Sequence, residues 1–160
     1  MTPTTDERLA SIIRSLTEVI LPHLPPEASL AQEQVHLAIG HLQILRAQID
    51  AIPAFEQEEL DDAIAIGHAL IESVSGGAET SAALEALKNA VAAKDGSDIR
   101  GQVMAINQAI DALVKAGHRD GHDGARQSLS SIILKYEASR VLKDRKWFLP
   151  YGFDTLELPT

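Results

Sequence analysis

One uninterrupted helical pattern constrains this chain more than any other feature of its sequence. The 24 residues from Ser29 to Ile52, SLAQEQVHLAIGHLQILRAQIDAI, contain no proline and place apolar or small residues alternately four and three positions apart. Such spacing puts those side chains on one face of an α-helix. They are Ala31, Val35, Ala38, Leu42, Leu45, Ile49 and Ile52. We therefore expect a long core helix here, with the rest of the chain packed around it.

The remaining chain repeats this periodicity in segments that helix breakers separate. Residues 5–21 are expected to form a helix that Thr4 or Thr5 caps and that the prolines at 22, 25 and 26 stop. Further helices are expected at about 54–75, 79–94, 98–116 and 125–143. No segment shows the alternation of a β-strand apart from an extended piece at the end. The sequence thus predicts an all-α, up-down-like bundle of five or six helices.

The last fourteen positions differ in composition from the rest of the chain. Four of the six aromatic residues, Trp147, Phe148, Tyr151 and Phe153, fall within seven positions that also contain a proline and a glycine. Aromatic rings of this number are costly to leave in water, since each buries ~150–250 Å² when it is covered. We expect residues 1–146 to form a single domain. Residues 147–160 are expected to form an extended tail that packs on the bundle or on a partner subunit.

The charge of the chain narrows the range of its partners. The net charge is −9, and residues 1–79 hold 13 acidic and 3 basic residues. An acidic surface repels phosphate backbones, which argues against nucleic-acid binding. No apolar run approaches the ~18 residues needed to cross a membrane, and the first residues lack the positive charge of a signal peptide. The expectation is a cytoplasmic protein that binds neither nucleic acid nor membrane.

Motifs for familiar chemistry are missing from the sequence. There is no cysteine, which excludes disulfides, thiolate catalysis and cysteine-ligated metals. The sequence also lacks a Gly-x-Ser-x-Gly elbow, a Gly-x-Gly-x-x-Gly turn and a P-loop. We therefore predict no cofactor and no catalytic residue.

Two groups of residues have the composition of weak metal-site candidates. Glu33 and His36 match the Glu-x-x-His spacing of di-iron four-helix bundles, but the chain has no second copy and both residues fall outside the apolar face. His118 and His122 lie in the glycine-rich segment Gly117–Gly124, whose spacing does not match a calcium-binding loop. The simpler interpretations are a solvent-facing polar pair and an ordinary helix connection, so no metal is predicted.

An interhelical pocket is the remaining hypothesis for a site. His41 lies at the edge of the apolar face and has a side chain that titrates near neutral pH. Gly67 lies on the apolar face of the 54–75 helix, where a missing side chain allows either close helix approach or room for a ligand. His68 lies beside it. The simpler interpretations are a core-edge histidine at His41 and a surface pair of His68 with Glu72.

Two segments resemble small uncharacterised helical proteins that are encoded beside aminoglycoside-phosphotransferase-like kinases and acyl-CoA dehydrogenases. They are the run VHLAIGHLQILRAQID and the closing ASRVLKDRKWFLP, which together cover under a fifth of the chain. Those proteins have no established activity, so the resemblance implies no substrate, cofactor or partner.

The sequence favours a non-enzymatic helical bundle that acts through protein–protein association, as a homodimer or as an accessory subunit. Three observations support this interpretation. They are the absence of catalytic motifs, the aromatic tail, and the contrast between an acidic first half and a near-neutral second half. The alternative is a small-molecule-binding or catalytic bundle with a pocket near His41 and His68. A third hypothesis is a metal-binding, ferritin-like bundle that uses Glu33 and His36.

Overall fold

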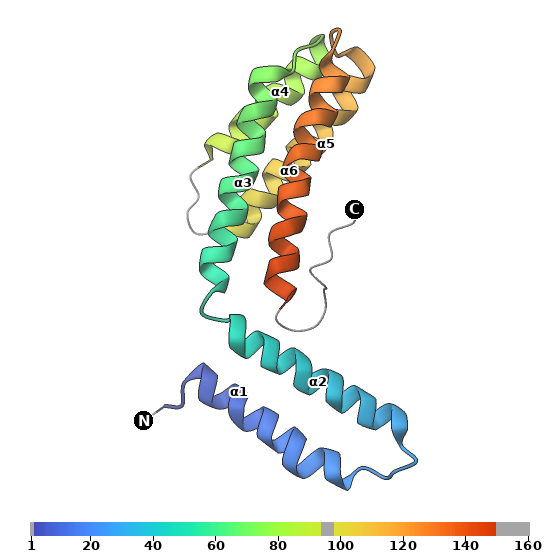
Figure 1. Cartoon of the computed structure of the whole chain (residues 1–160). Coiled ribbons are helices and arrows are strands. Elements are labelled where there is room, and N and C mark those ends of the chain that lie inside the picture. Colours follow the sequence, from blue (N-terminus) through green and yellow to red (C-terminus); the bar gives the residue numbers. More distant parts are fainter. Residues whose placement is uncertain (1, 94–97, 150–160) are drawn as a thin grey trace. The chain divides into compact units, whose positions relative to one another are not determined.

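Helices make up most of the part of the chain that the structure describes. A computed structural model describes residues 2–93 and 98–149, and the regular elements within those ranges are all helices. Figure 1 shows α1 and α2 as one pair, and α3 to α6 running alternately up and down. The α-helices are α1 (Thr5–Arg14), α2 (Ser29–Gln48), α3 (Ile52–Ser73), α4 (Ala78–Ala92), α5 (Ile99–Asp120) and α6 (Ala125–Phe148). The predicted all-α bundle is confirmed.

The helices group into two compact units. Unit 1 comprises the residues up to Ile52, and unit 2 comprises the residues from Pro53 onward. The boundary falls at Pro53, directly after the segment Ser29–Ile52 that the sequence predicted as one long helix. That residues 1–146 form one folding domain stays a prediction.

The first rod of unit 1 begins at a capping box. Glu7 donates its backbone N–H to the Thr4 hydroxyl at 3.2 Å, and Thr4 donates its own N–H to the Glu7 carboxylate at 2.7 Å. These two bonds satisfy donors that a helix N-terminus leaves without partners. Beyond α1 the rod continues as a π-helix over Ser15–Ile20 and a 3₁₀ turn over Leu21–His23. It ends at the prolines, as predicted.

α2 returns beside α1 and forms the second arm of a hairpin (Figure 1). Arg46 near the end of α2 pairs with Asp6 near the start of α1, with 2.5 Å between the Arg46 Nε and the Asp6 Oδ1 atoms. A contact between the end of one helix and the start of the other requires the two arms to be antiparallel. The hairpin is thus two helices wide and one layer deep.

α2 is not the core helix that its periodicity predicted. Ile44 is its one buried residue, and its leucines at 30, 37 and 45 are 69%, 47% and 41% exposed. Ala31 and Ala38, both predicted to point inward, are also exposed. The helix itself is confirmed, but α1 covers one side of it only. An apolar face therefore does not establish that the chain supplies something to cover it.

The buried core lies in unit 2. All four of its helices contribute, and Leu70, Leu87, Ile106 and Leu113 have no exposed surface. The full cluster consists of Leu60, Ala63, Ile66, Leu70, Val74, Leu87, Val91, Ile106, Ala109, Ile110, Leu113, Ala125 and Leu129. Four helices can enclose a core of apolar side chains, because each helix buries its apolar stripe against more than one neighbour. Two helices alone cannot do so.

α5 extends further than the sequence predicted. It continues to Asp120, so the first half of the expected Gly117–Gly124 loop is helical. Gly117 is buried, and a Cβ atom built on it would lie 2.7 Å from Leu129 Cδ1 in α6. The glycine allows two helices to approach closely instead of ending one of them.

The first two residues of the predicted tail are helical. Trp147 and Phe148 belong to α6, which corrects the expectation of an extended segment from residue 147. The Trp147 ring stacks on Phe55 of α3, with 4.3 Å between the ring centroids. This contact gives the tryptophan a partner within unit 2. Tyr151 and Phe153 lie outside the described residues.

Candidate functional site

The residues proposed for an interhelical pocket fall in both units. His41 is exposed on α2 in unit 1, while Gly67 and His68 are neighbours on α3 in unit 2. Gly67 is buried, and a Cβ atom on it would lie only 2.6 Å from the Val91 Cγ2 atom of α4. The missing side chain thus serves close helix packing. His68 is exposed. A pocket near His41 and His68 stays a prediction.

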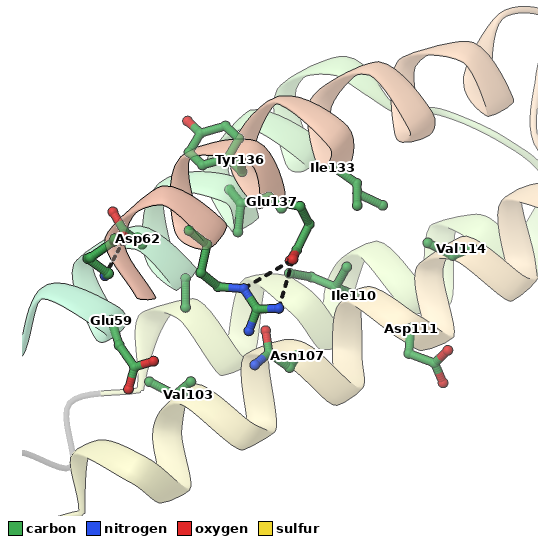
Figure 2. Close-up of a pocket in the computed structure, with 14 residues that line it drawn as sticks. Glu59, Asp62, Val103, Asn107, Ile110, Asp111, Val114, Ile133, Tyr136 and Glu137 are labelled. Carbon is green, nitrogen blue, oxygen red and sulfur yellow. Dashed lines mark hydrogen bonds and ion pairs between the residues drawn. The ribbon is translucent and has the colours of Figure 1, made fainter. Parts of the chain in front are cut away.

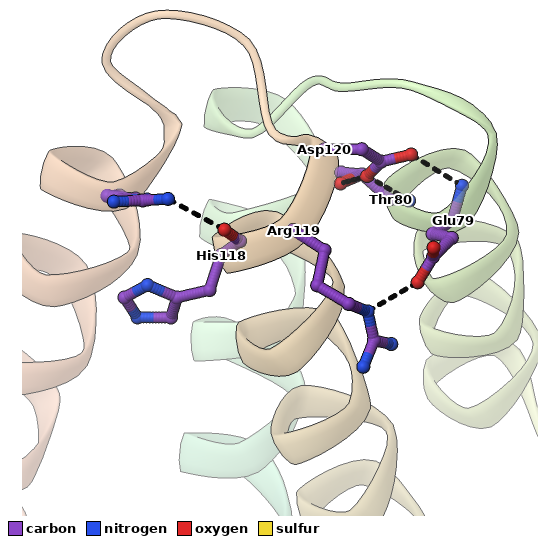
Figure 3. A network of polar contacts seen from close by, with 6 residues as sticks. Glu79, Thr80, His118, Arg119 and Asp120 are labelled. Atoms are coloured by element: carbon purple, nitrogen blue, oxygen red, sulfur yellow. Dashed lines mark hydrogen bonds and ion pairs between the residues drawn. The ribbon is translucent and has the colours of Figure 1, made fainter.

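The metal-site candidates are all on the surface. Glu33 and His36 are exposed on α2, and His118 and His122 are exposed at the end of α5 and in the connection after it. Within residues 2–93 and 98–149 no group of three or more metal-ligating side chains is placed to hold an ion. Figure 3 shows the His118 ring pointing away from the neighbouring polar network.

That network joins the end of α5 to the start of α4 (Figure 3). The Asp120 carboxylate accepts hydrogen bonds from the backbone N–H groups of Glu79 at 2.8 Å and Thr80 at 2.9 Å, and from the Thr80 hydroxyl at 2.5 Å. Gly77 donates its N–H to the Asp120 carbonyl at 2.8 Å. The first N–H groups of a helix have no partner within that helix. Asp120 therefore caps α4 from a different helix.

The electrostatics of this cap follow from its hydrogen bonds. The Thr80 hydroxyl first, and then the two backbone N–H groups, lower the pKa of Asp120, and Arg119 contributes to the same effect. Hydrogen bonds to a carboxylate favour its ionised form. Thr80 is fully buried, and its hydroxyl is satisfied by this one carboxylate. The network holds the end of α5 against the start of α4.

The hairpin of unit 1 carries the first candidate functional surface. Six large apolar side chains on it are between 41% and 69% exposed. We call this set the hairpin face: Ile12, Val19 and Ile20 from the first rod, and Leu30, Leu37 and Leu45 from α2. Only Leu9 and Ile44 are buried among the described residues of unit 1. Several large apolar side chains exposed on one small unit make it a candidate for a binding surface.

α2 also carries little charge for an exposed helix. Its 20 residues include Glu33 and Arg46 as the charged side chains, and Arg46 is already paired with Asp6. A helix that faces water normally carries charged residues over its outer surface. The composition of α2 is that of a helix covered on both sides, and within the described residues of unit 1 only the first rod packs against it.

A cavity in unit 2 is the second candidate. It has a volume of about 370 Å³ and lies between α3, α5 and α6 (Figure 2). Its apolar lining comprises Ala63, Ile66, Val103, Ile110, Val114 and Ile133, with Tyr136 beside them. Polar groups surround this lining, among them Glu59, Asn107 and Arg140. The volume falls in the ~300–1,000 Å³ range of small-molecule pockets.

Sequence reasoning did not find this cavity. Val103, Asn107 and Val114 of α5 share a face with Ile110, and an asparagine within that apolar stripe is the one local signal of a polar opening. The cavity also needs a face from α3 and another from α6, and their registers are set by tertiary packing. A single sequence does not reveal those registers.

Comparison with models of known protein families, with curated proteins and with solved structures found no match. Among the described residues, none of the helices combines the length and the apolar character needed to cross a bilayer. The function of the chain must therefore be argued from these surfaces alone.

Proposed function

We propose that this protein acts through self-association, with the hairpin face of one copy packed on the hairpin face of a second copy. The single observation that supports the proposal best is the exposure of six large apolar side chains on a two-helix unit. Burying a large aliphatic side chain completely contributes ~1.5–3 kcal/mol. Each copy therefore exposes several side chains whose burial would favour association.

The spacing of these residues suits helix pairing. Leu30 and Leu37 of α2 are seven positions apart, and Leu45 follows eight positions later. Positions seven or eight apart lie on the same side of a helix, two turns from each other. A second layer of two helices packed on this side produces a four-helix arrangement with its own core.

A second copy fits the hairpin face better than a charged partner does. Only Glu33 and Arg46 are charged in α2, so the face offers little that would select a strongly charged surface. A two-fold axis pairs one surface with its own copy and requires only that the surface be self-complementary. A single-layer hairpin meets this condition, because each copy supplies the layer that the other lacks.

The size of the face lies at the lower end of the range for stable dimers. The 20 residues of α2 span ~30 Å, and two adjacent helices are ~20 Å wide, which gives roughly 600 Å² per copy. Stable interfaces bury ~800 Å² per partner on average. The hairpin face alone approaches that area.

Light scattering coupled to size exclusion tests the proposal on the full chain. We expect a dimer mass for the natural sequence, and a shift toward monomer for Leu37→Glu, with a dissociation constant raised roughly 10- to 100-fold. Gln43→Glu is the matched control, since it adds the same charge at an exposed polar position of α2. A natural chain that stays monomeric at ~100 μM, far above the dissociation constants of most specific dimers, would contradict the proposal.

A further inference from the structure

We propose that the cavity between α3, α5 and α6 binds a small amphipathic cation, a molecule with an apolar body and one ammonium group. The inference concerns unit 2 alone and does not depend on self-association. It is based on the shape of the cavity, on the order of its lining residues and on the pairing of its charged groups.

The lining has apolar side chains along its length and acidic side chains toward both ends, with Glu59 at one of them. Figure 2 shows Glu59 and Val103 on one side of the cavity, and Ile133 and Val114 on the opposite side. Asn107 lies between these two sides of the cavity. An elongated ligand would therefore place its polar head near Glu59 and its apolar body along the isoleucines and valines.

The cations of the cavity already have carboxylate partners. Arg140 donates to the Glu137 carboxylate at 3.0 Å and 2.8 Å, and Lys143 pairs with Asp62 at 2.6 Å. Each pair neutralises its own charge, so an incoming anion would have to compete with a carboxylate that each cation already binds. The lining offers no unpaired positive group to a carboxylate or a phosphate.

One acid of the lining remains without such a partner. Asp111 pairs with Lys115 at 2.6 Å, and in an adjoining cavity of about 270 Å³ Arg100 pairs with Glu56 at 2.6 Å. Glu59 lines both cavities, is half-buried, and has no hydrogen bond or ion pair to any described residue. A half-buried carboxylate without a partner favours binding of a cation.

Charge complementarity therefore selects the ligand class. The lining includes four acids and two bases, and both bases are neutralised within it. The polar head of the ligand would bond to the Glu59 carboxylate and to the Asn107 side-chain oxygen, while Tyr136 contributes a ring against which an ammonium or its alkyl chain can pack. A neutral ligand would use the apolar lining only, and an anion would be repelled.

Three probes of equal length and different head charge test the proposal: octylammonium, octanol and octanoate. Ligand-observed NMR titrations on the full chain at neutral pH should show octylammonium binding tightest and octanoate weakest. Glu59→Gln should weaken octylammonium about three- to ten-fold and change octanol less than about two-fold, since only the cation uses the carboxylate. Val114→Phe, which places a ring within the apolar lining, should weaken all three.

The matched control is Glu58→Gln, which removes the same charge from an exposed neighbour outside the lining. Glu59→Gln keeps the size of the side chain, so it tests the proposal even where Val114→Phe does not fold. Equal effects of the two glutamine variants, octanoate binding as tightly as octylammonium, or no saturable binding of any probe would each overturn the proposal.

Discussion

The two units of this chain are both built from helices that carry apolar side chains, yet they differ in what they bury. Unit 2 encloses a core in which Leu70, Leu87 and Leu113 have no exposed surface, whereas Leu9 and Ile44 are the buried residues in the described part of unit 1. The difference lies in the number of layers. Four helices surround an interior, while two helices share a single seam and leave their outer faces in solvent.

An apolar helix face therefore has a different role in each unit. In unit 2 the face is satisfied within the chain, so its residues determine stability. In unit 1 the exposed apolar residues are available to a second molecule, so under our proposal they determine association. The variants below test whether the two units behave in these two different ways.

The largest expected effect is the removal of a core side chain from unit 2. Leu113→Ala should lower the free energy of unfolding by about 2–5 kcal/mol, because it leaves a cavity in a place without exposed surface. Urea titration followed by the fluorescence of Trp147, the single tryptophan and a residue of unit 2, measures this loss.

The Leu113→Ala midpoint should not change with protein concentration, because its cause lies inside one copy. A loss of unfolding free energy below 1 kcal/mol, or a loss that changes on protein dilution, would contradict the assignment of Leu113 to a core inside one copy. Circular dichroism in the same titration reports all helices. If its transition differs from the fluorescence transition, the prediction of one domain over residues 1–146 is wrong.

Substituting one glycine in each unit should give effects of opposite sign. Gly67→Ala in α3 should destabilise the fold by about 1–3 kcal/mol, since its Cβ atom would lie 2.6 Å from the branched Val91 side chain. Gly40→Ala in α2 should stabilise the fold by about 0.5–1 kcal/mol, since a Cβ atom there would meet nothing within 4 Å. Urea titration followed by circular dichroism measures the change in the free energy of unfolding of each variant. Two changes of the same sign would contradict the structure.

Local interactions made much of the fold predictable. The first helix begins where Thr4 was expected to cap it, because the capping box with Glu7 involves residues three positions apart. The prolines after it act through their own backbone geometry. The end of α5 was not predictable in this way. Gly117 has the composition of a helix stop, but its packing against Leu129 keeps it helical, and that contact depends on the position of α6.

The candidate surfaces depend on information that a single sequence lacks. The apolar periodicity of Ser29–Ile52 predicted its helix, but not whether another helix covers it. Asp120 caps α4 by accepting a hydrogen bond from Thr80, which lies forty positions earlier in the sequence. The cavity beside Glu59 forms only when α3, α5 and α6 pack in one particular register. In each case the local pattern predicts which residues share a face, and tertiary packing decides what that face meets.

The smallest expected effects come from one acidic residue in each unit. The Arg46 guanidinium lowers the pKa of Asp6 through a hydrogen bond in unit 1, and the Thr80 hydroxyl together with backbone N–H groups lowers the pKa of Asp120 in unit 2. A lowered carboxyl pKa stabilises the folded state above the ordinary pKa of aspartate, and this contribution is lost as the pH falls through the lowered value.

At neutral pH, Asp120→Ala should lower Tm by roughly 5 °C, because it removes the cap of α4. Asp6→Ala should lower Tm by about 1 °C, because an exposed ion pair contributes little. Both differences from the natural chain should shrink as the pH falls below the lowered pKa values. Added salt should reduce the Asp6 difference and leave the Asp120 difference unchanged, since salt screens exposed charges but not hydrogen bonds to backbone groups. Thermal melts by circular dichroism at two pH values and two salt concentrations measure both differences in Tm. If added salt removed the Asp120 difference, Asp120 would act as an exposed surface charge and not as the cap of α4.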